Sequence, residues 1–316
     1  MRFFLLIKII FSLLLFTFVV LKLDRHVISH IFNTTNGIKA LVLGVSMLLL
    51  QVLISGFRLS MVLKLYDIQL DFLTSIRSCF VGNFFSQTMI SFLGGDAVRI
   101  WYLKRRSIIT KTVVSAIFLD RVIGFIALIF LFLLLFPSLM SINMLSSMRY
   151  GVMLLLAGSV SAVAIFFLLA LLSRWPKELI FQKTLDIFIE LCSSARHLFF
   201  SFRNSAVIFL LSLGIQLLNI IIIYHIFQCY NVELSFYWCS VLAVPALLIS
   251  MLPISIAGWG VRETAMVMGF SLVGIPADKI LSVSIIFGLA LFFAGLPGLF
   301  IFLFERKQPR AHVSEP

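Results

Sequence analysis

Long apolar runs separated by short polar segments dominate the sequence. The runs cover residues 3–21, 38–57, 112–136, 150–172, 204–227 and 280–304. Each is close to or above the roughly 20 residues that a helix needs to cross a bilayer, so the pattern predicts six full spans. The first run begins after Arg2, contains Lys8 near its start and resembles a signal peptide. Because no small-x-small cleavage site follows it, we expect an uncleaved first helix.

Two further stretches are apolar but interrupted. Residues 72–105 carry polar side chains within a moderately apolar sequence, and residues 236–277 contain Pro253 followed by two glycines and a charged pair. The segment after that pair, residues 264–277, would form roughly 21 Å of helix, too short for a hydrocarbon core of about 30 Å. We therefore expect two re-entrant broken-helix hairpins, since irregular backbone at this depth is tolerated only inside protein or beside a water-filled cavity.

The basic residues predict the orientation. If residues 72–105 crossed the bilayer, the cluster after them would face the outside, against the positive-inside rule. A hairpin that enters from the cytoplasm keeps the whole cluster inside with Arg58 and Lys64; the cluster is Arg99, Lys104, Arg105, Arg106 and Lys111. Residues 174–203 alternate apolar and charged positions at helical spacing, which predicts a cytoplasmic interfacial helix. Both termini, including the polar tail 306–316, are then cytoplasmic.

This orientation makes two parts of the chain alike. Span, hairpin and span follow one another from residue 38 to residue 136 and again from residue 204 to residue 304, with opposite sense. Inverted repeats with broken helices that meet near the midplane are typical of transporters. We expect one all-α polytopic domain over residues 1–305 with this inverted-repeat arrangement.

Composition agrees with a membrane protein. The chain of 316 residues is 61% hydrophobic and 12% charged, whereas soluble domains carry about 25% charged residues. The net charge of +12 fits loops that contact anionic headgroups better than a nucleic-acid partner. His26 and His30 lack a third metal ligand, the cysteines show no metal or redox spacing, and no phosphate-binding loop of ATPases is present. We therefore expect no cofactor.

Three clusters combine glycine with charge inside the apolar sequence, where ionisable groups are costly and functional by default. They are Gly94-Gly95-Asp96-x-x-Arg99, Asp120-Arg121-x-x-Gly124 and Gly258-x-Gly260-x-Arg262-Glu263. Neighbouring residues on a helix point about 100° apart, so Asp120 and Arg121, and likewise Arg262 and Glu263, are not expected to satisfy one another. We expect a cross-linked set instead, drawn from Asp96, Arg99, Asp120, Arg121, Arg262 and Glu263.

Two interpretations of these clusters remain open. Buried ion pairs can lock a packing arrangement without binding anything. Alternatively, glycines admit backbone N–H groups to a ligand, and arginine is a bidentate clamp for phosphate, which favours a lipid headgroup as the partner. Asn83 and Gln87 are one turn apart and either line a cavity or bond to a neighbouring helix.

At these clusters the sequence resembles the membrane domain of the lysylphosphatidylglycerol synthase/flippase family, a group of bacterial and archaeal integral membrane proteins. The resemblance extends to Pro253 and Ser255. It implies a flippase-like transporter of a phosphate-bearing lipid, phospholipid or polyprenyl-linked, in the cytoplasmic membrane. Two-domain members continue into a soluble aminoacyl-transferase domain, so this chain is not expected to make an aminoacylated lipid. Trp259 stands where the motif leads us to expect glycine, which predicts a bulkier outer hairpin tip.

Two other functions stay open. A non-transporting subunit would bind lipid, a lipid-modifying enzyme or a glycosyltransferase through residues 174–203. A membrane-embedded transferase would use Asp96 or Glu263 as general base, but the sequence offers no Asp-x-Asp or His-rich loop, so we expect no enzyme. A second copy of the chain is a further candidate partner.

Overall fold

The computed structural model describes residues 35–66, 68–88, 92–105, 110–142, 146–172, 202–251 and 259–304. Within these ranges the secondary structure is helical, with no strand. The helices are α3 (Thr35–Lys64), α4 (Phe72–Thr88), α5 (Phe92–Lys104), α6 (Thr110–Met140), α7 (Ser146–Leu172), α10 (Phe202–Cys229), α11 (Phe236–Ser250), α12 (Val261–Phe270), the 3₁₀ turn η2 (Ser271–Val273) and α13 (Ala277–Phe304). The expected first span, nearly all of the interfacial helix 174–203, residues 89–91 and 252–258 of the expected hairpins, and the tail 306–316 lie outside the described residues.

Among the described residues, five helices are long and apolar enough to cross a membrane. They are Asn36–Lys64, Thr110–Met140, Met148–Phe166, Arg203–Cys229 and Ala277–Phe304. They correspond to the second to sixth predicted spans. The prediction of an all-α polytopic membrane protein is confirmed.

Two predicted helix ends are wrong. Helix α3 continues past residue 57 to Lys64 because Leu59, Val62 and Leu63 are fully buried and extend its packing face. The expectation that Arg58 follows the span therefore fails, and this residue lies inside the helix. Helix α6 runs through Pro137 to Met140, since a proline in the last turn removes only one backbone hydrogen bond before the helix ends.

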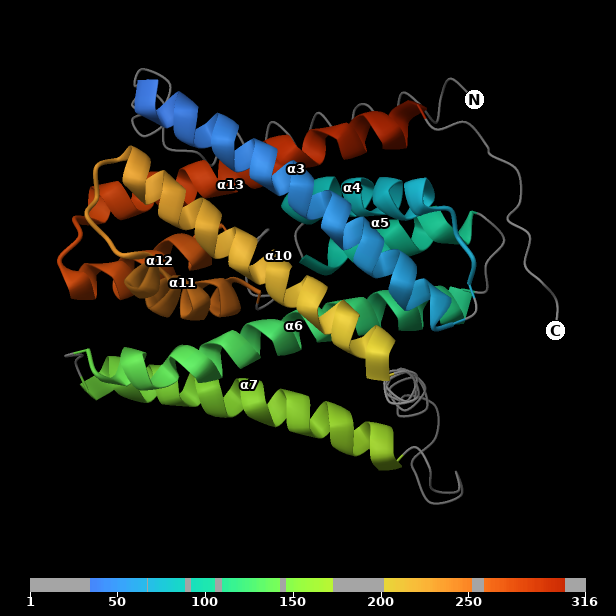
Figure 1. The fold of residues 1–316 in the computed structure, drawn as a ribbon, viewed down its shortest axis with the longest axis horizontal. Helices are drawn as coiled ribbons and strands as arrows, with labels where there is room; N and C mark the ends of the chain where they lie inside the picture. Colours follow the sequence, from blue (N-terminus) through green and yellow to red (C-terminus); the bar gives the residue numbers. More distant parts are fainter. Residues whose placement is uncertain are drawn as a thin grey trace.

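The long helices run along the molecule, and the short helices α4, α5, α11 and α12 lie among them (Figure 1). The pair α4 and α5 lies toward one end of the long axis, and the pair α11 and α12 toward the other. Helix α3 packs on α10, α4 packs on α13, and α11 packs on α6. Helix α7 contacts α6 at the outside of this group.

The helix contacts repeat between the two halves of the chain. The helices α3, α4, α5 and α6 of the first half correspond in order to α10, α11, α12 and α13 of the second half. Under this correspondence the contact of α4 with α13 matches the contact of α11 with α6. The contact of α3 with α13 becomes that of α10 with α6, and α3 with α10 maps onto itself. The contacts within each half correspond in the same way. The two segments therefore occupy equivalent positions in the helix packing.

Close backbone approach fixes the short helix α4 in place. A Cβ on Gly298 of α13 would overlap the carbonyl of Phe80, and one on Gly95 of α5 would overlap Ser86 Oγ and the carbonyl of Gly82. Small residues at such contacts are how membrane helices gain van der Waals packing without a hydrophobic driving force. Helix α4 is thus held tightly between α5 and α13.

Candidate functional site

A buried ion pair joins the two long helices α3 and α6. The guanidinium of Arg58 donates from Nε to Asp120 Oδ1 at 2.8 Å and from Nη2 to Oδ2 at 3.0 Å. Its Nη1 donates to Ser212 Oγ of α10 at 2.9 Å. Only 9% and 2% of the two charged side chains are exposed. This bidentate geometry is the strong form of the arginine–carboxylate interaction.

A second carboxylate extends the pair into a network. Asp96 of α5 accepts from Arg121 Nε at 2.7 Å and from Arg121 Nη2 at 2.9 Å, and from Arg99 Nη1 at 3.3 Å. The second terminal nitrogen of Arg99, Nη2, lies 3.7 Å from Asp120 Oδ2. We call Arg58, Asp96, Arg99, Asp120 and Arg121 the inner cluster. The prediction that Asp120 and Arg121 find partners on other segments is confirmed.

The outer charged pair behaves differently. Arg262 Nη2 donates to Glu263 Oε1 at 2.8 Å, and Ser284 Oγ of α13 bonds both residues, at 3.2 Å from Arg262 Nε and 3.1 Å from Glu263 Oε1. The guanidinium also lies 5.0 Å from the Trp259 ring and 5.5 Å from the Phe287 ring. We call Arg262, Glu263 and Ser284 the outer cluster.

The expectation that Arg262 and Glu263 do not satisfy one another is wrong. Helix α12 begins at Val261 with Gly260 as its N-cap, and Glu263 Oε2 turns back to accept from the Gly260 N–H. This capping interaction brings the carboxylate to the helix end, where the long arginine side chain reaches it despite the angle between the two Cα–Cβ bonds. Gly260 has φ 86°, a conformation that favours glycine.

Three arginines of the two clusters each lie against a helical glycine. A Cβ on Gly82 would overlap the Arg99 side chain, a Cβ on Gly288 would overlap Arg262 Nη2, and a Cβ on Gly124 would lie 3.4 Å from Arg58 Nη1. Of these three glycines, Gly124 belongs to the predicted motifs, and it makes room for a guanidinium group. Gly82 and Gly288 make room for arginine side chains in the same way but lie outside those motifs.

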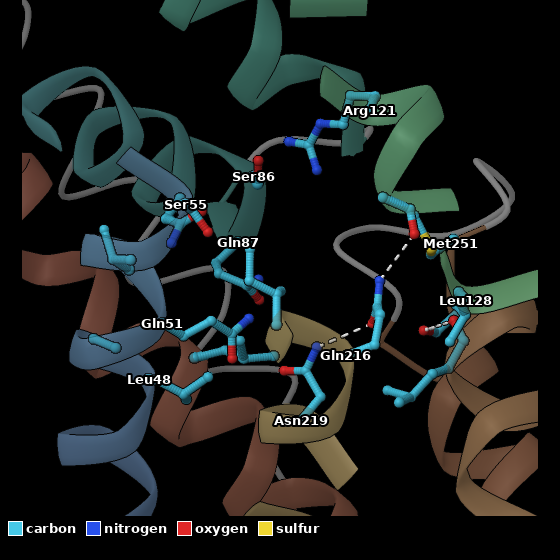
Figure 2. Close-up of a pocket in the computed structure, with 18 of the residues that line it drawn as sticks. Leu48, Gln51, Ser55, Ser86, Gln87, Arg121, Leu128, Gln216, Asn219 and Met251 are labelled. Atoms are coloured by element: carbon cyan, nitrogen blue, oxygen red, sulfur yellow. Dashed lines mark hydrogen bonds between the residues drawn. The ribbon is translucent and has the colours of Figure 1, made fainter. Parts of the chain in front are cut away.

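One polar cavity of about 200 Å³ lies between the two clusters. Arg58, Asp120 and Arg121 line it from the inner cluster, and Arg262 from the outer cluster. The remaining polar lining consists of amides and hydroxyls from four helices: Gln51, Ser55, Asn83, Ser86, Gln87, Gln216, Asn219 and Ser250. Figure 2 shows Gln51, Gln87 and Asn219 facing the same space, with Arg121 at its edge. The cavity is several times larger than the space that one water needs.

The other predicted site residues have definite places. Gly94 and Gly95 lie in the first turn of α5, and Asn83 and Gln87 line the cavity. Gly258 belongs to residues 252–258, outside the described residues. The expected cross-linked set is wrong in one respect, since no ion pair joins Arg262 or Glu263 to the inner cluster within the described part of the chain. Across the same residues, no group of three His, Cys, Asp or Glu side chains gathers to hold a metal ion.

Sequence reasoning missed Arg58 and the amides of the long helices. Gln51, Ser55 and Arg58 have i, i+4 and i+7 spacing, which places them on one face of α3. On α10, Gln216 donates to the Gly124 carbonyl at 3.1 Å and accepts from Asn219 Nδ2 at 3.3 Å. Polar stripes at helical spacing inside apolar spans were therefore the signal that could have identified this part of the cavity.

Comparison with known proteins supports the resemblance found from the motifs. The family described as lysylphosphatidylglycerol synthase TM region matches residues 5–298. No significant match was found among curated proteins, and none among solved structures. The family match spans both clusters and every residue that lines the cavity. The chain therefore belongs to the lysylphosphatidylglycerol synthase transmembrane-region family, as a multi-pass membrane protein of lipid metabolism or transport.

Proposed function

We propose that this protein moves a phosphate-bearing lipid between the leaflets of the membrane. The headgroup would occupy the polar cavity while its chains remain in the bilayer. The proposal rests on one observation: arginines of both clusters line the same cavity. Charged side chains at this depth are costly, and a cavity that gathers them needs a ligand or water to solvate them.

The charge balance favours an anionic ligand. Counted over the described ion pairs, Arg58, Arg99, Arg121 and Arg262 face Asp96, Asp120 and Glu263, four cations against three carboxylates. One excess positive charge in a low-dielectric site attracts a phosphate strongly. Arginine also matches phosphate geometry through its planar fork of donors.

The repeated helix contacts suggest how such a ligand would cross. If the two halves are inverted repeats, rocking of one against the other around a fixed site gives access from each side in turn. The cavity takes residues from both halves, with α3, α4 and α6 on one side and α10 to α13 on the other. In this account the two short-helix pairs are re-entrant hairpins that enter from opposite sides of the membrane.

We place the end of the molecule that holds α4 and α5 in the cytoplasm. Helix α3 ends at Lys64, α5 ends at Lys104, and α6 begins at Thr110 with Lys111. Helix α10 begins at the same end of the long axis, with Arg203 in its first turn (Figure 1). The positive-inside rule assigns this end to the cytoplasm, in the cytoplasmic membrane of a bacterium or archaeon.

Transport fits the carboxylates better than group transfer. A general base needs a carboxylate that can accept a proton from substrate, whereas Asp96, Asp120 and Glu263 each accept from arginine. We therefore assign these three residues to balancing the arginines, and propose no catalysis.

Leaflet redistribution of a fluorescent phospholipid in proteoliposomes tests the proposal. We expect Arg262→Gln and Arg121→Gln to lower the rate by about tenfold or more, because each removes a phosphate-binding charge. Arg149 is exposed on α7, away from the cavity, so Arg149→Gln is the matched control. Equal rates in all three variants and the wild type would remove the site assignment, and no redistribution by the wild type would remove the function.

A further inference from the structure

A bound phosphate alone would not account for the unpartnered amide oxygens in the cavity, because a phosphate ester offers few hydrogen-bond donors. The Oε1 atoms of Gln51 and Gln87 and the Oγ of Ser86 are buried and have no hydrogen-bond partner among the described residues. Gln87 is 9% exposed and Ser86 3% exposed. All three line the polar cavity, and Figure 2 shows Gln51 and Gln87 directed toward its interior.

Unpartnered polar atoms are expensive inside a membrane protein. A buried acceptor without a partner costs about 1–3 kcal/mol, and membrane interiors supply no bulk water to replace the lost bond. Each carboxamide presents both donors and acceptors, and each serine hydroxyl does the same. The ligand group that complements such a surface also donates and accepts, which is the property of a hydroxyl.

The charges around the cavity argue against a cationic headgroup. Asp120 accepts two hydrogen bonds from Arg58, and Asp96 accepts three from Arg121 and Arg99. Glu263 accepts from Arg262, Ser284 and the Gly260 N–H. An ammonium group would therefore find occupied carboxylates and an excess of arginine, with like-charge repulsion as the main electrostatic effect.

We infer that the cavity selects a lipid whose phosphate carries a polyhydroxylated group, a sugar or a polyol, over one with a cationic or unsubstituted phosphate. This inference rests on the proposed function and specifies its substrate class. Arg121 and Arg262 contact the phosphate, while Gln51, Ser86 and Gln87 bond the hydroxyls. The volume of about 200 Å³ lies below the roughly 300–1,000 Å³ of pockets that enclose whole drug-sized ligands, so it suits a headgroup rather than a whole lipid.

Competitive lipid retention, measured by native mass spectrometry on the purified full chain, tests the inference. The probes are phosphatidylglycerol, phosphatidylethanolamine and phosphatidic acid with identical acyl chains, and a polyprenyl phosphate that carries one hexose, against the same polyprenyl phosphate without it. We expect hydroxyl-bearing lipids to be retained about tenfold better than their counterparts, the effect of one or two buried hydrogen bonds. Comparison within the three phospholipids tests glycerol as the source of the hydroxyls, and comparison of the two polyprenyl phosphates tests a sugar.

Gln51→Met together with Gln87→Met should abolish the preference while phosphate lipids are still retained. Because these substitutions remove unpartnered polar atoms, we expect an unchanged or higher Tm, whereas a purely structural role would lower it. Gln69 is exposed in the loop before α4, and Gln69→Met should leave both the preference and the Tm unchanged. The single variants report on each amide if the double variant fails to fold.

The other outcomes are distinct. Equal retention of all phosphate lipids would mean that water satisfies the amides, and would overturn the inference while the phosphate site stands. Stronger retention of phosphatidylethanolamine would overturn it in favour of a cationic headgroup. A Tm increase by sodium ions that is lost in the double variant, without any hydroxyl preference, would assign the oxygens to a cation. Failure of the wild type to retain any phosphate lipid would contradict the proposed function itself.

Discussion

The inner and outer clusters face one cavity but are built in opposite ways. The inner cluster joins residues of three helices, α3, α5 and α6, through ion pairs between distant parts of the sequence, and it reaches α10 through the hydrogen bond from Arg58 to Ser212. The outer cluster pairs two adjacent residues and reaches one other helix through a single serine. The same chemical groups therefore hold the fold together on one side, and stay within one short helix and its neighbour on the other.

This difference assigns separate tasks to the arginines. Removal of Arg58 leaves the Asp120 carboxylate, which is 2% exposed, without its main partner. The inner cluster therefore contributes to the stability of the fold. Arg262 can exchange its contact with Glu263 for one with a phosphate without loosening any ion pair between helices. We therefore assign ligand exchange mainly to the outer cluster, and anchoring mainly to the inner cluster.

The largest expected effect comes from the inner cluster. Arg58→Leu should lower the free energy of unfolding by about 3–5 kcal/mol, because it leaves Asp120 charged and buried without its bidentate partner. Chemical unfolding in detergent micelles measures the change. Combining Arg58→Leu with Asp120→Leu should restore part of the loss. Arg149→Leu on the exposed face of α7 is the control, and a loss in Arg58→Leu no larger than in this control would end the distinction between the clusters.

A smaller effect on stability but a clear effect on transport is expected at Gly288. A Cβ there would overlap Arg262 Nη2 and approach Trp259, so Gly288→Ala should displace the guanidinium from Ser284. We expect lipid redistribution to slow by about tenfold and the free energy of unfolding to fall by about 1–3 kcal/mol, the typical cost of added bulk in a packed site. A Cβ on Gly151 of α7 meets nothing within 4 Å, which makes Gly151→Ala the matched control. Wild-type transport in Gly288→Ala would show that the position of Arg262 is unimportant.

The smallest effect is expected at the N-cap of α12. Gly260 has a positive φ and a Cβ there would meet nothing within 4 Å, so Gly260→Ala adds backbone strain without a clash. The expected cost is about 1–2 kcal/mol, seen as a modest decrease in Tm with the lipid preference intact. A cost as large as that of Arg58→Leu would mean that the outer cluster also anchors the fold.

Much of the fold follows from the sequence because bilayer thickness and positive charge constrain it strongly. Hydropathy predicts the five described spans. Hydropathy and residue spacing also mark the two interrupted stretches and the three clusters of glycine and charge. Arg58 was misplaced because a lone arginine after an apolar run indicates a loop, unless its partner is known. That partner, Asp120, is 62 residues away in the sequence, and no local pattern specifies the pairing.

The cavity was harder to predict than the clusters. Gln51 and Gln87 come from different helices, and the packing of α4 against α3 brings them together. The contact of Arg262 with Glu263 also escaped prediction, because it depends on the capping geometry at Gly260 rather than on the directions of the Cα–Cβ bonds. Long polar side chains can meet wherever a helix end lets one of them turn back.

The central claim is that one cavity receives the headgroup and opens to each side of the membrane in turn. Ser55 lines this cavity from α3, so the most direct measurement is modification of Ser55→Cys by a membrane-impermeant thiol reagent in proteoliposomes. The other cysteines are replaced, and Ser235→Cys, exposed at the start of α11, serves as the one-sided control. The account predicts labelling of Ser55→Cys from both sides, slowed by a phosphate lipid. Labelling from one side only, whatever lipid is present, would contradict it.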